Sequence, residues 1–183
     1  MSAGTNEQIT TSFSSFIGLQ SYTEAQADSF FGRDKEIDHL TQLVRLNTLT
    51  IVFGKSGTGK TSLLNAGVFP LLRKNYCLPF RLRLEFNEDS PDLVTQIKNV
   101  LKKEIDAYGF KVSSYPTTET LWEYFHQEPL WKNITPILVF DQFEEIFTLA
   151  GKNPRFAKEE KENFWTELSD LAENSIPEKL RET

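Results

Sequence analysis

The chain has 183 residues, of which 39% are hydrophobic and 25% charged, and its formal net charge is −6 at pH 7. This length predicts one domain, and the acidic balance argues against a partner that presents a phosphate backbone, so no nucleic acid is expected. Cys77 is the single cysteine and no apolar run could span a bilayer, so we expect a cytoplasmic protein without disulfides or a membrane partner.

The amino-terminal end of the chain is polar and then becomes more apolar. Residues 1–15 are rich in Ser, Thr, Gly and Asn and show no periodicity, which predicts a disordered leader. Residues 16–183 are expected to form the folded domain. Within them, apolar residues recur at helical spacing after Asp34 and predict a helix from about 34 to 47.

The next apolar run breaks into a glycine-rich loop. Ile51 to Phe53 are expected to form a strand, which leads into the pattern Gly-x-x-x-x-Gly-Lys-Thr that ends at Thr61. Gly54, Gly57 and Gly59 allow a tight turn that aims backbone N–H groups inward, and the following helix adds the positive end of its dipole. This spacing is the phosphate-binding P-loop, so we expect the chain to bind a nucleotide.

Four polar side chains of the P-loop have expected roles. Lys60 is expected to reach the β- and γ-phosphates as a point charge, and the Thr61 hydroxyl to ligate Mg²⁺. Ser56 and Thr58 complete the loop around the phosphates. Apolar residues beyond Thr61 continue at helical spacing, so the strand, loop and helix that a P-loop requires are all predicted.

A strand and several helices are predicted downstream of the P-loop. Residues 80–86 alternate between apolar and polar, which predicts a strand near the edge of a sheet with one wet face. Arg81 and Arg83 lie on that wet face and could reach a partner, although solvation is the default expectation. The predicted helices begin at Ser90-Pro91, near Thr117 and at Asn153-Pro154, and the first and last of them end at Gly109 and near Asn174.

A second apolar run ends in an acid. Residues 136–140 predict a strand buried on both faces of a parallel sheet, and Asp141 follows at its carboxyl end, the Walker B arrangement that holds Mg²⁺ beside a P-loop. Asp141 is expected to bind the ion, and either Glu144 or Glu145 to act as the general base, because a carboxylate there can orient the attacking water. The spacing leaves open which glutamate does so. The alternative is an acidic first helical turn that serves only the helix dipole.

Five sequence blocks in this order resemble the STAND ATPases, specifically the novel STAND NTPase group. The resemblance covers about residues 16 to 149. The blocks are Phe16-Ile17-Gly18-Leu19, Phe30-Phe31-Gly32-Arg33, Gly54 to Ser62, Ala66 to Leu72 and Asp141 to Thr148.

The resemblance carries a fold and a set of nucleotide contacts. It implies a P-loop NTPase fold of class α/β, three layers with a parallel sheet of five strands, of which the sequence provides about three. The remaining strands are therefore expected beyond Thr183. The resemblance also implies that Phe31, Gly32 and Arg33 contact the adenine and its ribose, and that the loop through Ser62 holds the phosphates. Docking of the amino-terminal segment is the alternative role of the two phenylalanines.

The resemblance further implies a molecular switch that uses ATP, ADP and Mg²⁺. In such proteins ADP holds a closed monomer, and exchange for ATP opens it into an oligomer that activates a fused effector. Bacterial relatives include antiviral defence proteins. Self-association through the full-length protein, and sensor and effector domains beyond residue 183, are the implied partners besides the nucleotide. We expect weak or absent turnover by residues 1–183 alone.

Three other functions compete with a hydrolysing switch. The nearest is a nucleotide-gated interaction domain that never turns over. A small-molecule kinase would need an arginine-rich lid, and few arginines follow Asp141. A pure scaffold would make Lys60 irrelevant to nucleotide affinity. GTP is disfavoured as the nucleotide, because the chain contains no Asn-Lys-x-Asp element.

Overall fold

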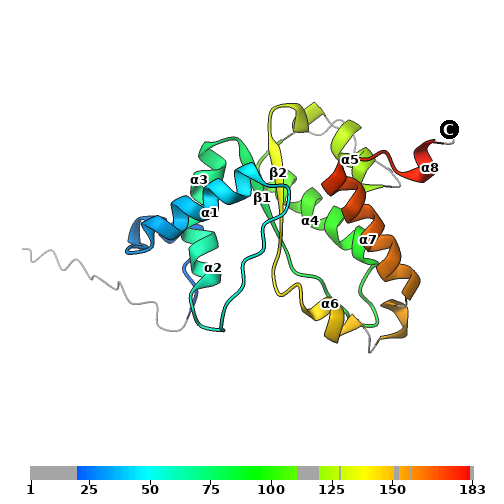
Figure 1. Ribbon diagram of the computed structural model, residues 1–183, viewed down its shortest axis with the longest axis horizontal. Helices are drawn as coiled ribbons and strands as arrows, with labels where there is room; N and C mark the ends of the chain where they lie inside the picture. The colour runs from blue at the N-terminus through cyan, green and yellow to red at the C-terminus, as the bar shows by residue number, and fades with distance from the viewer. Residues whose placement is uncertain (1–19, 111–119, 128, 151–152, 157, 182–183) are drawn as a thin grey trace, which may run out of the picture.

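The computed structural model describes residues 20–110, 120–127, 129–150, 153–156 and 158–181. Two parallel strands stand in the middle of the molecule and helices lie on both sides of them (Figure 1). In chain order the described elements are η1 (Glu24–Ser29), α1 (Asp34–Leu46), α2 (Lys60–Ser62), η2 (Leu63–Val68), α3 (Phe69–Lys74), β1 (Cys77–Leu82), α4 (Leu93–Ala107), α5 (Leu121–Gln127), η3 (Pro129–Lys132), β2 (Thr135–Phe140), α6 (Glu145–Thr148), η5 (Pro154–Phe156), α7 (Lys158–Glu173) and α8 (Glu178–Arg181).

The two strands form a parallel sheet, as the expected α/β fold requires. β1 pairs with β2 from Cys77 opposite Thr135 to Leu82 opposite Phe140. The last pair is Leu82 with Phe140, because β2 ends there. β1 therefore ends earlier than the strand predicted at residues 80–86. The burial alternation continues beyond it, with Leu84 buried. The fold class is confirmed, while the described sheet has two strands instead of the expected three.

The segment before the P-loop is not a strand in this structure, which corrects one expectation. Residues 49–55 have no ladder partner, and the side chains of Ile51 and Phe53 are 74% and 89% exposed. Apolar strands are stable when both faces are covered and both edges are paired. In the described structure a hollow separates residues 50–53 from α1, so this apolar segment lacks such cover.

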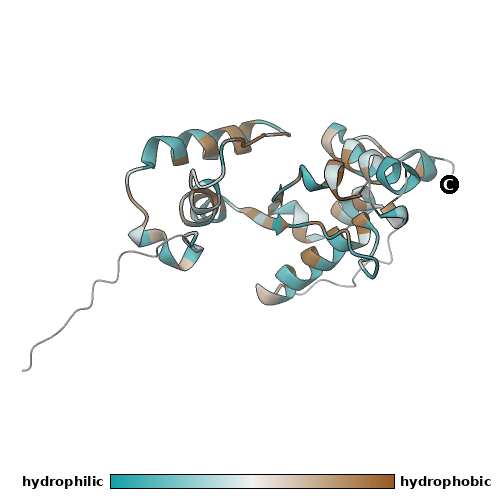
Figure 2. Ribbon diagram, turned by 90° about the horizontal axis from the view of Figure 1, so that it is seen from below, coloured by the Kyte–Doolittle hydropathy of each residue, from teal (hydrophilic) through white to brown (hydrophobic). Residues whose placement is uncertain are grey.

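The residues of the two strands alternate between two hydrophobic cores. One core, here called the P-loop-side core, contains Leu40, Leu63, Val68, Phe69, Leu72 and Cys77, with Ile137 and Val139 packed against it. The larger core on the other face joins β1 and β2 to α4, α5, α6 and α7. Figure 2 shows the corresponding two groups of helices on either side of the strands, and α1 with alternating hydrophilic and hydrophobic stretches.

The helix boundaries differ from the predicted ones by a few residues. α4 begins after Asp92, whose carboxylate accepts a hydrogen bond from the backbone N–H of Thr95 at 2.8 Å, so Asp92 caps the helix in place of Ser90. Ser90 instead accepts from the backbone N–H of Asn87 at 3.3 Å. Gly109, with φ +69°, follows the end of α4 as predicted.

Two predictions fall outside the described residues, namely the leader at residues 1–15 and the helix start near Thr117. The predicted last helix is described as η5 followed by α7, which ends one residue before Asn174. Across the described ranges, no helix combines the length and apolar character needed to cross a membrane.

Candidate nucleotide-binding site

The P-loop turns through two glycines in the left-handed region. Gly57 has φ +79° and Gly59 has φ +78°, conformations that L side chains rarely adopt. A Cβ atom added at Gly57 would meet no atom within 4 Å, so the turn itself requires this glycine and the space beside it is open. Gly59 is the N-cap of α2, which continues through η2 into α3 as one helical run. The loop therefore ends at the start of a helix, as predicted.

Side chains of the loop fold back on its own carbonyl groups. The Lys60 ammonium donates to the carbonyl oxygens of Gly54 and Lys55 at 2.8 and 3.0 Å. The Thr58 hydroxyl donates to the same Lys55 carbonyl at 2.9 Å. These contacts curl residues 54–58 around the lysine, so its positive charge lies where the concave side of the loop would receive an anion.

Ser62 is buried against the amino-terminal segment. Its hydroxyl oxygen accepts a hydrogen bond from the backbone N–H of Tyr22 at 3.1 Å, and the amide of Asn65 donates to the Tyr22 carbonyl at 3.3 Å. Arg73 donates to both carboxylate oxygens of Glu24 at 2.6 and 3.1 Å. Together these bonds connect η1 and its flanking residues to the helical run of α2, η2 and α3, here called the P-loop helix.

Arg33 comes to the P-loop from a distant part of the chain. Its guanidinium donates to the Thr58 carbonyl at 3.4 Å, and a Cβ atom at Gly59 would lie 3.9 Å from the same nitrogen. A second nitrogen of Arg33 bonds Glu36 at 2.8 Å, and the pKa of Glu36 is lowered, first by a hydrogen bond from its own backbone N–H and then by Arg33. Phe31, by contrast, is 79% exposed.

Asp141 lies on the P-loop face at the carboxyl end of β2. Because strand side chains alternate, Asp141 shares its face with Ile137 and Val139, which pack on the P-loop-side core. Its backbone N–H donates to the Leu82 carbonyl at 2.8 Å and extends the ladder by one residue. In Figure 1 the P-loop, between α1 and α2, and α6, just after Asp141, both lie along the lower side of the view, to the left and right of the strands.

Two arginines, Arg81 in β1 and Arg83 just beyond its end, bind the acids of the candidate site. Arg81 donates to Oδ2 of Asp141 through Nη2 at 2.5 Å and Nε at 3.2 Å. Arg83 donates to Glu145 at 3.3 Å, and Glu144 is exposed at the N-cap of α6. The sequence predicted a solvated face as the default for these arginines and did not identify their partners. The one available signal was their alternation on a strand, since the partners lie 60 and 62 residues further along the chain.

A family model for novel STAND NTPase 1 matches residues 16–181. The chain belongs to this family. Membership makes it a nucleotide-binding module of a signalling NTPase family, whose members use a nucleotide and usually Mg²⁺, and it confirms the resemblance seen in the sequence. Searches of curated proteins and of solved structures gave no match.

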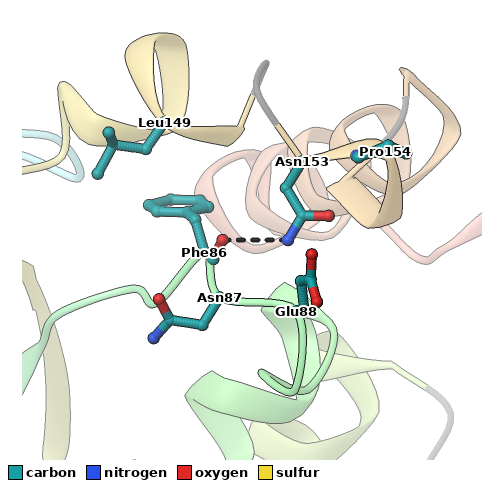
Figure 3. Close-up of a pocket in the computed structure, with 6 residues that line it drawn as sticks. All are labelled: Phe86, Asn87, Glu88, Leu149, Asn153 and Pro154. Carbon is teal, nitrogen blue, oxygen red and sulfur yellow. Dashed lines mark hydrogen bonds between the residues drawn. The ribbon is translucent and has the colours of Figure 1, made fainter.

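One hollow on the described part of the chain lies apart from the P-loop residues. Its volume is about 410 Å³. Asn153 and Phe86 both line it, and the Asn153 amide donates to the Phe86 carbonyl at 3.1 Å (Figure 3). Its lining contains none of the predicted site residues: Phe86, Asn87, Glu88, Leu149, Asn153 and Pro154. A second hollow of about 250 Å³ lies between α1 and residues 50–53 and includes Arg33. The second hollow therefore adjoins the predicted adenine side.

Proposed function

We propose that this chain is the ATP-binding, slowly hydrolysing switch module of a STAND signalling ATPase. In this proposal the nucleotide state controls self-association and, through it, a downstream effector, with antiviral defence as one setting. The observation that carries the proposal is the P-loop, with its two left-handed glycines, the inward ammonium of Lys60 and Arg33 beside Thr58.

The residues present fit a nucleotide with Mg²⁺. The helix start and Lys60 offer N–H groups and positive charge to the phosphates, and Gly54, Ser56, Gly57, Thr58 and Gly59 shape the loop around them. Mg²⁺ prefers oxygen ligands and is usually held by one or two carboxylates together with substrate phosphates. Thr61 and Asp141 would hold the ion, which when bound offsets the negative charge of the phosphates.

The adenine side and the hydrolytic step are assigned to further residues. Phe31, Gly32 and Arg33 would contact the base and ribose. Arg33 supports this by lying against the loop, and the exposure of Phe31 leaves its ring available for stacking. Glu144 or Glu145 would take up a proton from the attacking water. Ser62 would act through the backbone of α2, because its hydroxyl is bonded to Tyr22.

Nucleotide binding by the full chain tests the proposal. Removal of the Lys60 ammonium takes away a charged donor worth about 1.5–3 kcal/mol, so Lys60→Ala is expected to weaken ATP binding about 10- to 100-fold. Isothermal titration calorimetry measures the affinity. Lys55→Ala is the matched control, because it removes the same charge from the same loop while keeping the carbonyl that binds Lys60. Equal affinity for the wild type and Lys60→Ala would favour a scaffold instead.

Hydrolysis separates a switch with turnover from a binding domain without it. Since weak or absent turnover is expected of residues 1–183 alone, the test uses the full-length protein, where we expect slow phosphate release by the wild type and a loss of about 10²- to 10⁴-fold when the general base is replaced by glutamine. Glu144→Gln and Glu145→Gln, tested singly and together under single-turnover conditions, identify the base. If all four full-length proteins bind ATP and none releases phosphate, the nucleotide-gated interaction domain is the better interpretation.

A further inference from the structure

Arg81 places a positive charge beside Asp141, the candidate metal ligand. Both nitrogens of Arg81 that bind Asp141 converge on the same oxygen, Oδ2. In the register of the sheet Arg81 lies opposite Val139, two residues before Asp141, so both side chains project on the P-loop face. The guanidinium therefore reaches the carboxylate from the neighbouring strand, on the face that the P-loop-side core covers.

An arginine and a divalent cation compete for the same carboxylate lone pairs. The guanidinium does not lose its proton in proteins, so only movement of the side chain can release Asp141. The Arg81 side chain is 42% exposed and the Asp141 side chain 29%, so the arginine can turn into solvent without disturbing the core. An exposed ion pair of this kind is weak enough for a bound cation to displace it.

We propose that Arg81 guards Asp141 in the metal-free site and must release it when Mg²⁺ enters with the nucleotide. Arg81 thereby sets the Mg²⁺ concentration at which the site fills. This inference rests on the proposed function, because it takes Asp141 as a ligand of the ion. It assigns Arg81 a positioning role that the sequence did not indicate.

The test is a Mg²⁺ titration of ATP binding, followed by fluorescence of a labelled ATP analogue. Arg81→Gln is expected to lower the half-saturating Mg²⁺ concentration about two- to fivefold. A change of this size corresponds to the free energy of an exposed ion pair. The affinity for the analogue in EDTA is expected to stay unchanged. Arg81→Lys keeps the charge without the two-nitrogen contact and should give a smaller shift in the same direction.

Arg83→Gln is the matched control. It removes the same charge from the same face of the chain, two residues away, but from a pair with Glu145 instead of Asp141. Its Mg²⁺ titration should therefore coincide with that of the wild type. Circular dichroism confirms that each variant is folded. Electron paramagnetic resonance of Mn²⁺, displaced from the site by added Mg²⁺, gives a second readout that requires no turnover.

The outcomes separate the two proposals. Coinciding Mg²⁺ curves for the wild type and Arg81→Gln, or a shift to higher Mg²⁺, would overturn the guarding role while nucleotide binding stands. Weaker binding of the analogue in EDTA would overturn it too, and would make Arg81 a phosphate contact. Absence of analogue binding by the wild type would remove the proposed function, and the guarding role with it.

Discussion

At the scale of single residues, several side chains join segments that lie far apart in the sequence. The amide of Gln96 accepts from the N–H of Glu85 at 2.8 Å and donates to its carbonyl at 3.0 Å. This side chain thus satisfies the backbone polar groups of Glu85, which lies beyond the end of β1. Glu167 satisfies a backbone group at the start of α5. Its carboxylate accepts from the backbone N–H of Leu121 at 2.7 Å and from the ammonium of Lys179 at 3.2 Å.

The buried carboxylate of Glu167 gives a residue-scale prediction. Glu167 is only 3% exposed, so Glu167→Ala leaves a buried N–H at the start of α5 without its acceptor. We expect the free energy of unfolding to fall by about 1–3 kcal/mol. Urea denaturation followed by circular dichroism measures it. Glu162→Ala on the same helix breaks only an exposed pair with Lys158 and should cost less than about 0.5 kcal/mol. Equal costs would contradict the buried role.

At the scale of elements, α1 lies unusually close to the P-loop helix. The helical run widens to a π-helix at residues 63–68, which includes Gly67. A Cβ atom at Gly67 would lie 2.5 Å from Cγ1 of Ile37 on α1. Glycine is therefore needed here for space between two helices and not for its backbone angles. The contact holds α1, and the Gly32-Arg33 turn before it, against the P-loop.

Gly67→Ala tests this contact between elements. The added methyl group must displace the side chain of Ile37, and we expect unfolding to become easier by about 1–3 kcal/mol, as for other overpacked cores. The double variant Gly67→Ala/Ile37→Ala removes the clash, so its cost should be smaller than the sum of the two single costs. Thermal and chemical denaturation of the four proteins provide the cycle. Simple additivity would show that the helices do not meet at these residues.

At the scale of the whole molecule, the two strands separate two cores of unequal content. The larger core receives α4 to α7, and the P-loop-side core receives α1 and the P-loop helix. Residues 49–53 remain outside both, with Leu49, Ile51 and Phe53 largely exposed. This exposure distinguishes the observed two-stranded sheet from the three-stranded sheet expected from the sequence.

One substitution in residues 49–53 and one in β1 together test how many strands the sheet contains. Ile51→Thr changes an exposed side chain, so its effect on the free energy of unfolding should stay within about 0.5 kcal/mol. Leu82→Ala in β1 empties a fully buried position and should cost about 2–5 kcal/mol. Guanidinium denaturation measures both. A large cost for Ile51→Thr would indicate that residues 49–53 form a buried third strand.

Features that depend on local spacing could be predicted from the order of the residues. The glycines and Lys60 of the P-loop, the helix after Asp34 and the acid at the end of β2 were all predicted, because each is written in a few consecutive residues. The order of these blocks also identified the family, which the family model confirms. Helix starts were less accurate, since Ser90 and Asp92 are both good caps and only packing chooses between them.

The tertiary structure decided what depends on contacts between distant segments. The register of β1 on β2 brings Arg81 to Asp141 and Arg83 to Glu145, and docking of α1 brings Arg33 to Thr58. The described sheet has two strands instead of three because residues 49–53 pair with neither of them. Side-chain periodicity specifies which face a residue occupies but not which segment covers that face, and only the folded chain supplies the neighbour.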